Sequence, residues 1–151
     1  KGLINKGFNR ARTLEVVRPE TDFAQAPLLG IVAAGLPIEA IETKETLLIP
    51  PDMSGANIYA LKVKGDSMKD EGILEGDYVV IEKIEIPNSG DMVIALLDNE
   101  NVTLKRFFKE KDHFRLQPSN PAYGPIRTRQ LTIQGRVVGV IRKYQSFRSK
   151  I

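Results

Sequence analysis

The stretch MVIALLDNENVTLKRFF, residues 92–108, decides the fold class. It contains two apolar runs, Met92–Leu97 and Val102–Phe108, separated by the polar residues 98–101. Two β-rich runs on either side of a short polar turn predict a β-hairpin. In the second run, alternation places Thr103, Lys105 and Phe107 on one face of the strand, and Val102, Leu104, Arg106 and Phe108 on the other. One of the two basic residues therefore shares whichever face is buried.

Further strand-like runs lie on both sides of this hairpin, with glycine, proline or aspartate between them. They are Leu28–Val32, Leu47–Ile49, Ile58–Val63, Tyr78–Ile81, Phe114–Leu116 and Leu131–Tyr144. No segment has the pattern of a long amphipathic helix, and no internal repeat is found. The sequence therefore predicts a mostly β domain, barrel-like or sandwich-like.

The N-terminal part has a different composition. Residues 18–27 are polar, bounded by prolines and without helical or strand period, which predicts a linker. Within residues 1–17, two short apolar runs flank Gly7-Phe8-Asn9, which favours a β-hairpin too small to fold alone. We therefore expect a small N-terminal piece at 1–17, a linker at 18–27 and a main domain at 28–151.

Composition limits the chemistry. The 151 residues are 42% hydrophobic and 27% charged, as in ordinary globular proteins. There is no cysteine, which excludes disulfides, thiolate metal sites and a cysteine nucleophile. With a single histidine, His113, the sequence predicts neither a metal nor another cofactor. No apolar run reaches the roughly 18 residues of a membrane span, so we expect no membrane segment, and a cytoplasmic location fits.

The positive charge is concentrated at the start of the chain. Residues 1–19 hold five basic side chains, Arg10 and Arg12 among them, against the single acidic Glu15, whereas residues 28–151 hold 17 basic and 16 acidic ones. A basic segment of this kind is either a nucleic-acid contact or a solvated terminus.

Two residues are candidates for nucleophilic chemistry. Gly65-Asp66-Ser67-Met68 follows an alternating strand, and a glycine-containing turn there can expose a serine hydroxyl and direct backbone N–H groups toward one point. Lys105, if buried, loses its charge more easily and can act as a general base toward a serine. Each feature also has a plain interpretation, as a turn that ends a strand and as a solvent-facing lysine on an edge strand.

Three further features have open interpretations. Val32-Ala33-Ala34-Gly35 offers an accessible peptide bond or an ordinary loop. Gly135 and Gly139 flank Val137 in a strand, and they permit close packing either within the chain or against a second copy. His113 lies in a highly charged segment, where we expect it to be solvated, so no Ser-His-Asp triad is predicted. Lysine is the known alternative base for a serine nucleophile.

Together these pieces resemble the LexA family of self-cleaving repressors, which includes phage repressors and UmuD-type proteins. The resemblance covers residues 28–144, and its motifs occur in the family's order: Gly30–Gly35, Val63–Asp70, Leu74–Asp77, Gly90–Val93, Val102–Arg106 and Ile133–Ile141. It implies that Ser67 is the nucleophile, Lys105 the general base, Ala34–Gly35 the bond that is cut, and the N–H groups of Asp66 and Ser67 the oxyanion hole.

The resemblance also implies a fold and partners. The fold is a strongly bent, mostly β structure related to signal peptidases, which dimerises through residues 131–144. Residues 1–17 resemble the wing of a winged helix-turn-helix domain, with Arg10 and Arg12 as DNA contacts and the recognition helix absent. The partners would be operator DNA and a RecA filament on single-stranded DNA, which promotes the cut and so induces the DNA-damage response.

Two other functions share this serine–lysine chemistry. A UmuD-type polymerase accessory protein is the first alternative, but such proteins tend to carry cysteine where Ala34 stands. A signal-peptidase-like enzyme acting on other chains is the second, and the lack of a membrane anchor argues against it.

Overall fold

The computed structural model describes residues 23–97 and 101–144, whose regular structure is almost entirely β. Its strands are β2 (Ala24–Ala33), β3 (Glu39–Ile49), β4 (Ile58–Lys64), β5 (Tyr78–Glu82), β6 (Met92–Leu97), β7 (Asn101–Lys109), β8 (Phe114–Gln117), β9 (Ile126–Thr128) and β10 (Thr132–Ile141). Two short 3-10 helices, η3 (Pro51–Met53) and η4 (Lys69–Glu71), complete the set. The predicted mostly β fold is confirmed. No helix in the described ranges is long and apolar enough to span a membrane.

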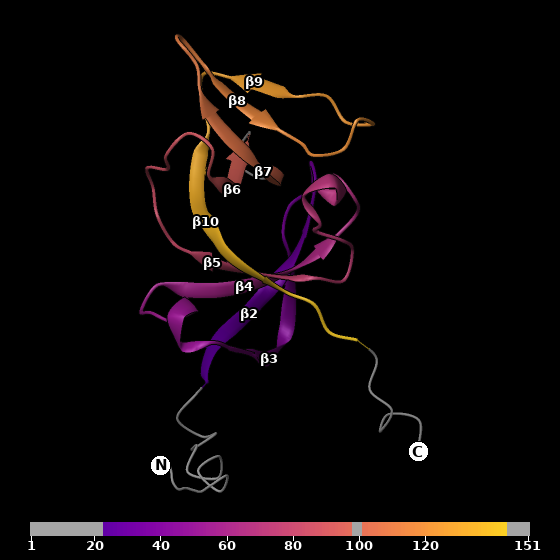
Figure 1. The fold of residues 1–151 in the computed structure, drawn as a ribbon, viewed down its shortest axis with the longest axis vertical. Helices are drawn as coiled ribbons and strands as arrows, with labels where there is room; N and C mark the ends of the chain where they lie inside the picture. Colours follow the sequence, from indigo (N-terminus) through magenta and orange to yellow (C-terminus); the bar gives the residue numbers. More distant parts are fainter. Residues whose placement is uncertain (1–22, 98–100, 145–151) are drawn as a thin grey trace, which may run out of the picture.

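All these strands belong to one sheet, in the order β3-β2-β4-β5-β10-β6-β7-β8-β9. Every neighbouring pair is antiparallel except β2 and β4, which run parallel. Figure 1 shows β10 as a long curved strand that joins the violet group of strands to the orange group. The edge strands β3 and β9 do not pair with each other, so the sheet is open. Figure 1 shows that it bends along β10.

Two glycines let β10 bend. The register of β10 shifts between Ile133 and Gly135 against β6, and between Val137 and Gly139 against β5. A Cβ at Gly135 would approach the carbonyl oxygen of Glu82 to 2.8 Å, closer than real Cβ contacts. Glycine at this position therefore reflects close packing within the chain, one of the two interpretations left open by the sequence.

β7 is buried on both faces, which places a charged residue in the interior. Val102 and Leu104 pack into the largest hydrophobic cluster, between the two groups of strands, with residues of β2, β4, β5 and β6. Phe107 packs on the other face with β6, β8 and β10 residues. Lys105 shares the face of Phe107 and is only 2% exposed, so the solvent-facing interpretation of this lysine is wrong.

The structure corrects several predicted boundaries. Residues 24–27 of the predicted linker belong to β2, because Ala26 alternates with exposed neighbours and packs into a hydrophobic cluster. Pro27 is tolerated there because β4 pairs with β2 only from Leu28 onward. The strand predicted at 47–49 begins at Glu39, β9 was not predicted, and β10 ends at Ile141 rather than Tyr144. The predicted hairpin at 1–17, the linker residues 18–22 and the turn residues 98–100 lie outside the described residues.

Candidate active site

Ser67 lies in the turn that follows β4. Gly65 has φ 90°, a left-handed conformation that favours glycine, and this reverses the chain immediately after the strand. The next residues lead into η4, and the side chain of Met68 is buried in the central cluster. Ser67 is thereby held half-buried between an anchored methionine and a tight turn.

Lys105 reaches this turn from β7. Its Nζ lies 3.1 Å from Ser67 Oγ, 2.5 Å from Thr103 Oγ1 and 3.1 Å from the carbonyl oxygen of Leu104. Among the described residues, no salt bridge to a carboxylate involves Lys105. Burial lowers the pKa of Lys105 from 10.5 to about 8, because desolvation disfavours the charged amine.

The lowered pKa of Lys105 raises the fraction of the side chain that carries a neutral amine. At the ordinary pKa about one lysine in three thousand is neutral at pH 7, whereas a pKa of about 8 leaves about one in ten neutral. A neutral Nζ at hydrogen-bond distance from a hydroxyl can accept its proton. This arrangement allows a proton to pass from the Ser67 hydroxyl to the Lys105 amine.

Backbone N–H groups are available beside the serine. In the part of the chain that the structure describes, no acceptor bonds to the N–H of Asp66 or Ser67, the two groups expected to form an oxyanion hole. The carbonyl groups of both residues accept bonds instead. The Asp66 oxygen accepts from Asn120 Nδ2 at 2.8 Å and from the Lys69 N–H at 3.2 Å, and the Ser67 oxygen accepts from the Ser119 N–H at 3.0 Å.

Ser119 and Asn120 were not among the residues predicted for this site. They belong to the connection between β8 and β9, and Pro118-Ser119-Asn120-Pro121 is a recognisable turn signal. That signal predicts a turn but not the residue that the turn contacts, because the bond from Asn120 to Asp66 joins residues 54 positions apart.

The predicted cleavage segment lies between β2 and β3. Gly35 has φ 76°, its N–H donates to the carbonyl oxygen of Val102 at 3.2 Å, and the Val102 N–H donates to the Leu36 oxygen at 3.0 Å. Leu36 and Val102 thus form an isolated β-bridge. The exposed loop that carries Ala34 and Gly35 therefore lies against the strand that carries Lys105.

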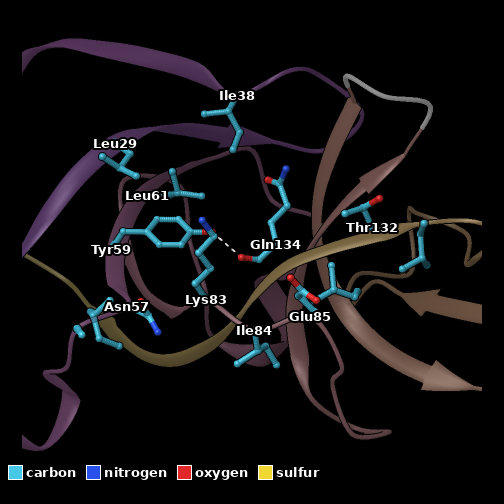
Figure 2. A pocket seen from close by; sticks show the side chains of 14 residues that line it. Leu29, Ile38, Asn57, Tyr59, Leu61, Lys83, Ile84, Glu85, Thr132 and Gln134 are labelled. Atoms are coloured by element: carbon cyan, nitrogen blue, oxygen red, sulfur yellow. Dashed lines mark hydrogen bonds between the residues drawn. The ribbon is translucent and has the colours of Figure 1, made fainter.

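A pocket lies apart from the pair of Ser67 and Lys105. It encloses about 820 Å³, and its lining, drawn from the described residues, includes neither Ser67 nor Lys105. Figure 2 shows Leu29 and Ile38, from either side of the cleavage loop, opposite Ile84 and Glu85. Across it, the Tyr59 hydroxyl donates to the Gln134 carbonyl oxygen at 3.2 Å, and burial raises the pKa of Tyr59 to about 12.

The other predicted residues lie away from the pair or outside the described ranges. His113 Nδ1 is 2.8 Å from Asp112 Oδ1 in the connection between β7 and β8, and the side chain is half-buried rather than solvated. Arg10 and Arg12, predicted DNA contacts, lie outside the described residues.

Comparisons with known proteins agree on one family. A family model described as Peptidase S24-like matches residues 27–138. The LexA repressor of Koribacter versatilis is 42% identical over 158 residues, which cover 95% of this chain and 75% of that protein. The LexA repressor of Brevibacillus brevis is 42% identical over 152 residues, covering 94% and 73%. That of Clostridium botulinum strain Langeland is 43% identical over 149 residues, covering 95% and 74%. The chain therefore belongs to the LexA family of S24-like peptidases.

Proposed function

We propose that this chain is the self-cleaving part of a transcriptional repressor of the DNA-damage (SOS) response, and that Ser67 and Lys105 cut its own Ala34–Gly35 bond. The observation that carries the proposal is the 3.1 Å approach of the buried Lys105 Nζ to Ser67 Oγ. The relatives named above are LexA repressors, which supports the repressor role over the UmuD-type alternative.

The reaction follows from the positions of these groups. Neutral Lys105 accepts the Ser67 hydroxyl proton while Oγ attacks the carbonyl carbon of Ala34, and the N–H groups of Asp66 and Ser67 stabilise the resulting oxyanion. The Lys105 ammonium then protonates the Gly35 nitrogen as the peptide bond breaks, which leaves Ala34 as an ester on Ser67. Lys105 next takes a proton from water, hydroxide attack releases the Ala34 carboxylate, and Ser67 regains its proton.

The position of the cleavage loop supports a cut within the same chain. Gly35 and Leu36 are bonded to Val102, three residues before Lys105 on β7. Small residues at Ala34 and Gly35 leave the carbonyl accessible. Closure of this loop over Lys105 also keeps water from the amine, so substrate docking and activation of the base are one coupled event.

The same coupling gives a partner a way to control the reaction. A RecA filament on single-stranded DNA that binds the docked loop in preference to the undocked one would accelerate the cut at neutral pH without supplying a catalytic group. In this proposal residues 1–17, with Arg10 and Arg12, are the wing of the DNA-binding domain, and operator DNA is bound by the longer protein.

We also propose a homodimer through residues 131–144. β10 pairs with β6 over residues 132–136 and with β5 over residues 136–141. Within the described residues, each part of the strand therefore has a second edge without a partner strand. Val138 and Val140 are exposed there. An unpaired edge with exposed valines is suited to pairing with the same strand of a second copy.

The test is self-cleavage of the purified chain at neutral and alkaline pH, followed by mass spectrometry. The expected fragments end at Ala34 and begin at Gly35, and Ser67→Ala abolishes the cut. Ser54→Ala, which alters an exposed serine in the turn after η3, should cleave like the parent. A cut at another bond, or cutting by Ser67→Ala, would contradict the assignment. Adding a RecA filament should raise the neutral-pH rate, and an unchanged rate would remove that partner from the proposal.

A further inference from the structure

The backbone around Ser67 is held by one segment from a distant part of the chain. Asn120 Nδ2 donates to the carbonyl oxygen of Asp66 at 2.8 Å, and the Ser119 N–H donates to the carbonyl oxygen of Ser67 at 3.0 Å. The Asp70 N–H donates back to the Ser119 oxygen at 2.7 Å. Two successive peptide groups of the serine turn are thus bonded to the same segment.

The bond from Asn120 reinforces the direction of a proposed oxyanion donor, because the Asp66 carbonyl oxygen also accepts the Lys69 N–H of its own turn, at 3.2 Å. The carbonyl of Asp66 and the N–H of Ser67 belong to the same trans peptide group, in which the two bonds point in opposite directions. When Asn120 holds the oxygen on one side, the Ser67 N–H must point to the other side. That N–H has no acceptor among the described residues, so it remains free to bind a developing negative charge.

Asn120 is itself held rigidly. Its side chain is 5% exposed, its Oδ1 accepts the Ala122 N–H at 2.9 Å, and its own carbonyl accepts the Tyr123 N–H at 3.0 Å. With Oδ1 committed to Ala122, the amide orientation that directs Nδ2 toward Asp66 is the one that satisfies both contacts. The donor therefore arrives at Asp66 from a preorganised turn.

We infer that Asn120 is a positioning residue of the peptidase site, which orients the Asp66–Ser67 peptide so that its N–H stabilises the oxyanion. This inference rests on the proposed function, since it concerns the rate of the same cut. It assigns to the β8–β9 connection a role in the chemical step. Asn120 contacts neither the cleavage loop nor Lys105 in the bonds described above, so its action passes through the peptide alone.

The test measures the self-cleavage rate from about pH 6 to about pH 10 in Asn120→Asp and Asn120→Ala. Asn120→Asp keeps the acceptor for the Ala122 N–H and the side-chain shape but replaces the donor with an oxygen that repels the Asp66 carbonyl. Asn120→Ala removes the donor without adding charge. Loss of an oxyanion donor lowers rates by about a hundredfold to a thousandfold, so misorientation of one should lower the maximal rate by about tenfold or more.

The pH profile separates positioning from other roles. We expect both variants to have a lower plateau, while Asn120→Ala reaches its plateau at the same pH as the parent, because its base is untouched. If the variants recover the parental plateau at higher pH, Asn120 acts on the protonation of Lys105 and the inference is wrong. Self-cleavage rates are compared at a temperature below the melting transition of every variant. If one Asn120 variant does not fold, the rate of the other tests the role of Asn120.

Tyr123→Phe is the matched control. The Tyr123 hydroxyl donates to the side-chain Oδ1 of Asp66 at 2.9 Å, so its loss alters the same residue but leaves the carbonyl contact intact. It should cleave within about twofold of the parent. A parent chain that does not cut itself overturns the proposed function. A parent that cuts through Ser67 while both Asn120 variants keep its plateau overturns only the role of Asn120.

Discussion

Thr103 and Lys105 lie two residues apart on the same face of β7, and Thr103 Oγ1 is 2.5 Å from Lys105 Nζ. Both side chains are almost fully buried. The threonine hydroxyl and the Leu104 carbonyl therefore fix the end of a long, flexible side chain at the distance that Ser67 requires. Strand alternation brings this about, because a residue at i−2 always lies beside residue i.

Thr103→Val should lower both the maximal cleavage rate and the pH at which it is reached. The hydroxyl oxygen accepts a bond from the charged amine, so its removal disfavours the ammonium and lowers the pKa of Lys105 further. The amine is also held less firmly at Ser67, which lowers the plateau severalfold. Rate–pH profiles of the purified variant check both effects. Thr128→Val, whose hydroxyl bonds to Gln130, is the control, and a rise in the midpoint would contradict the role of Thr103.

Self-cleavage should rise about tenfold per pH unit below about pH 8 and level off above it, because the rate follows the neutral fraction of Lys105. Lys105→Arg should cleave negligibly at neutral pH, since a guanidinium stays protonated in proteins. The measurement is the rate of fragment appearance for both chains across that range. A flat profile for the parent, or substantial neutral-pH cutting by Lys105→Arg, would exclude Lys105 as the base.

Lys105 should also make folding stability depend on pH. Its folded pKa of about 8 lies below the unfolded value of 10.5, so the unfolded chain binds more protons and stability rises between these two values. Below about pH 8 the shifted pKa of Lys105 lowers the free energy of unfolding by its full amount, about 3 kcal/mol. Urea unfolding should compare Ser67→Ala with Ser67→Ala/Lys105→Met, neither of which cuts itself. The free energy of unfolding of the double variant should exceed that of Ser67→Ala by the largest amount at neutral pH. A difference that does not change with pH would show that the protonation of Lys105 is not linked to stability.

Val138→Arg should shift the chain toward monomer in sedimentation, because it places a charge on the unpaired part of β10 that we propose for the dimer. Val138 is exposed, whereas Val137 packs against the central cluster, so arginine at Val137 would disturb folding as well. Leu48→Arg adds the same charge at an exposed position of β3 and should leave the association unchanged. A dimer that survives Val138→Arg at the parental affinity would place the interface elsewhere.

Local patterns predicted the strands whose apolar residues alternate or run together. They succeeded for β4, β5, β6 and β7, and the alternation around Lys105 correctly placed one basic residue on a buried face. They failed for the first part of β3, where residues 39–46 are mostly polar. That segment is an edge strand, whose structure comes from pairing with β2 rather than from its own hydrophobicity.

The sequence also predicted only part of the candidate site. Ser67 and Lys105 could be named from their motifs, but their 3.1 Å separation depends on the bend of the whole sheet. Asn120 could not be found from the sequence, since a turn signal carries no information about a carbonyl 54 residues away. Residues 24–27 were assigned to the linker because Pro27 and the small side chains of Ala24 and Ala26 conceal the alternation that buries Ala26.

The position of β2 inside the sheet has a consequence for what a cut at Ala34 would accomplish. β2 ends at Ala33 and is hydrogen-bonded to β3 on one edge and to β4 on the other, with Ala26, Leu28 and Val32 buried. Hydrolysis one residue beyond its end breaks none of these contacts, so its immediate product is a nicked protein whose two pieces remain associated. Everything N-terminal to β2 departs only when an inner strand is withdrawn from between its neighbours. Inactivation would therefore depend on two rates, the rate of bond hydrolysis at Ser67 and the rate at which β2 dissociates from its neighbouring strands.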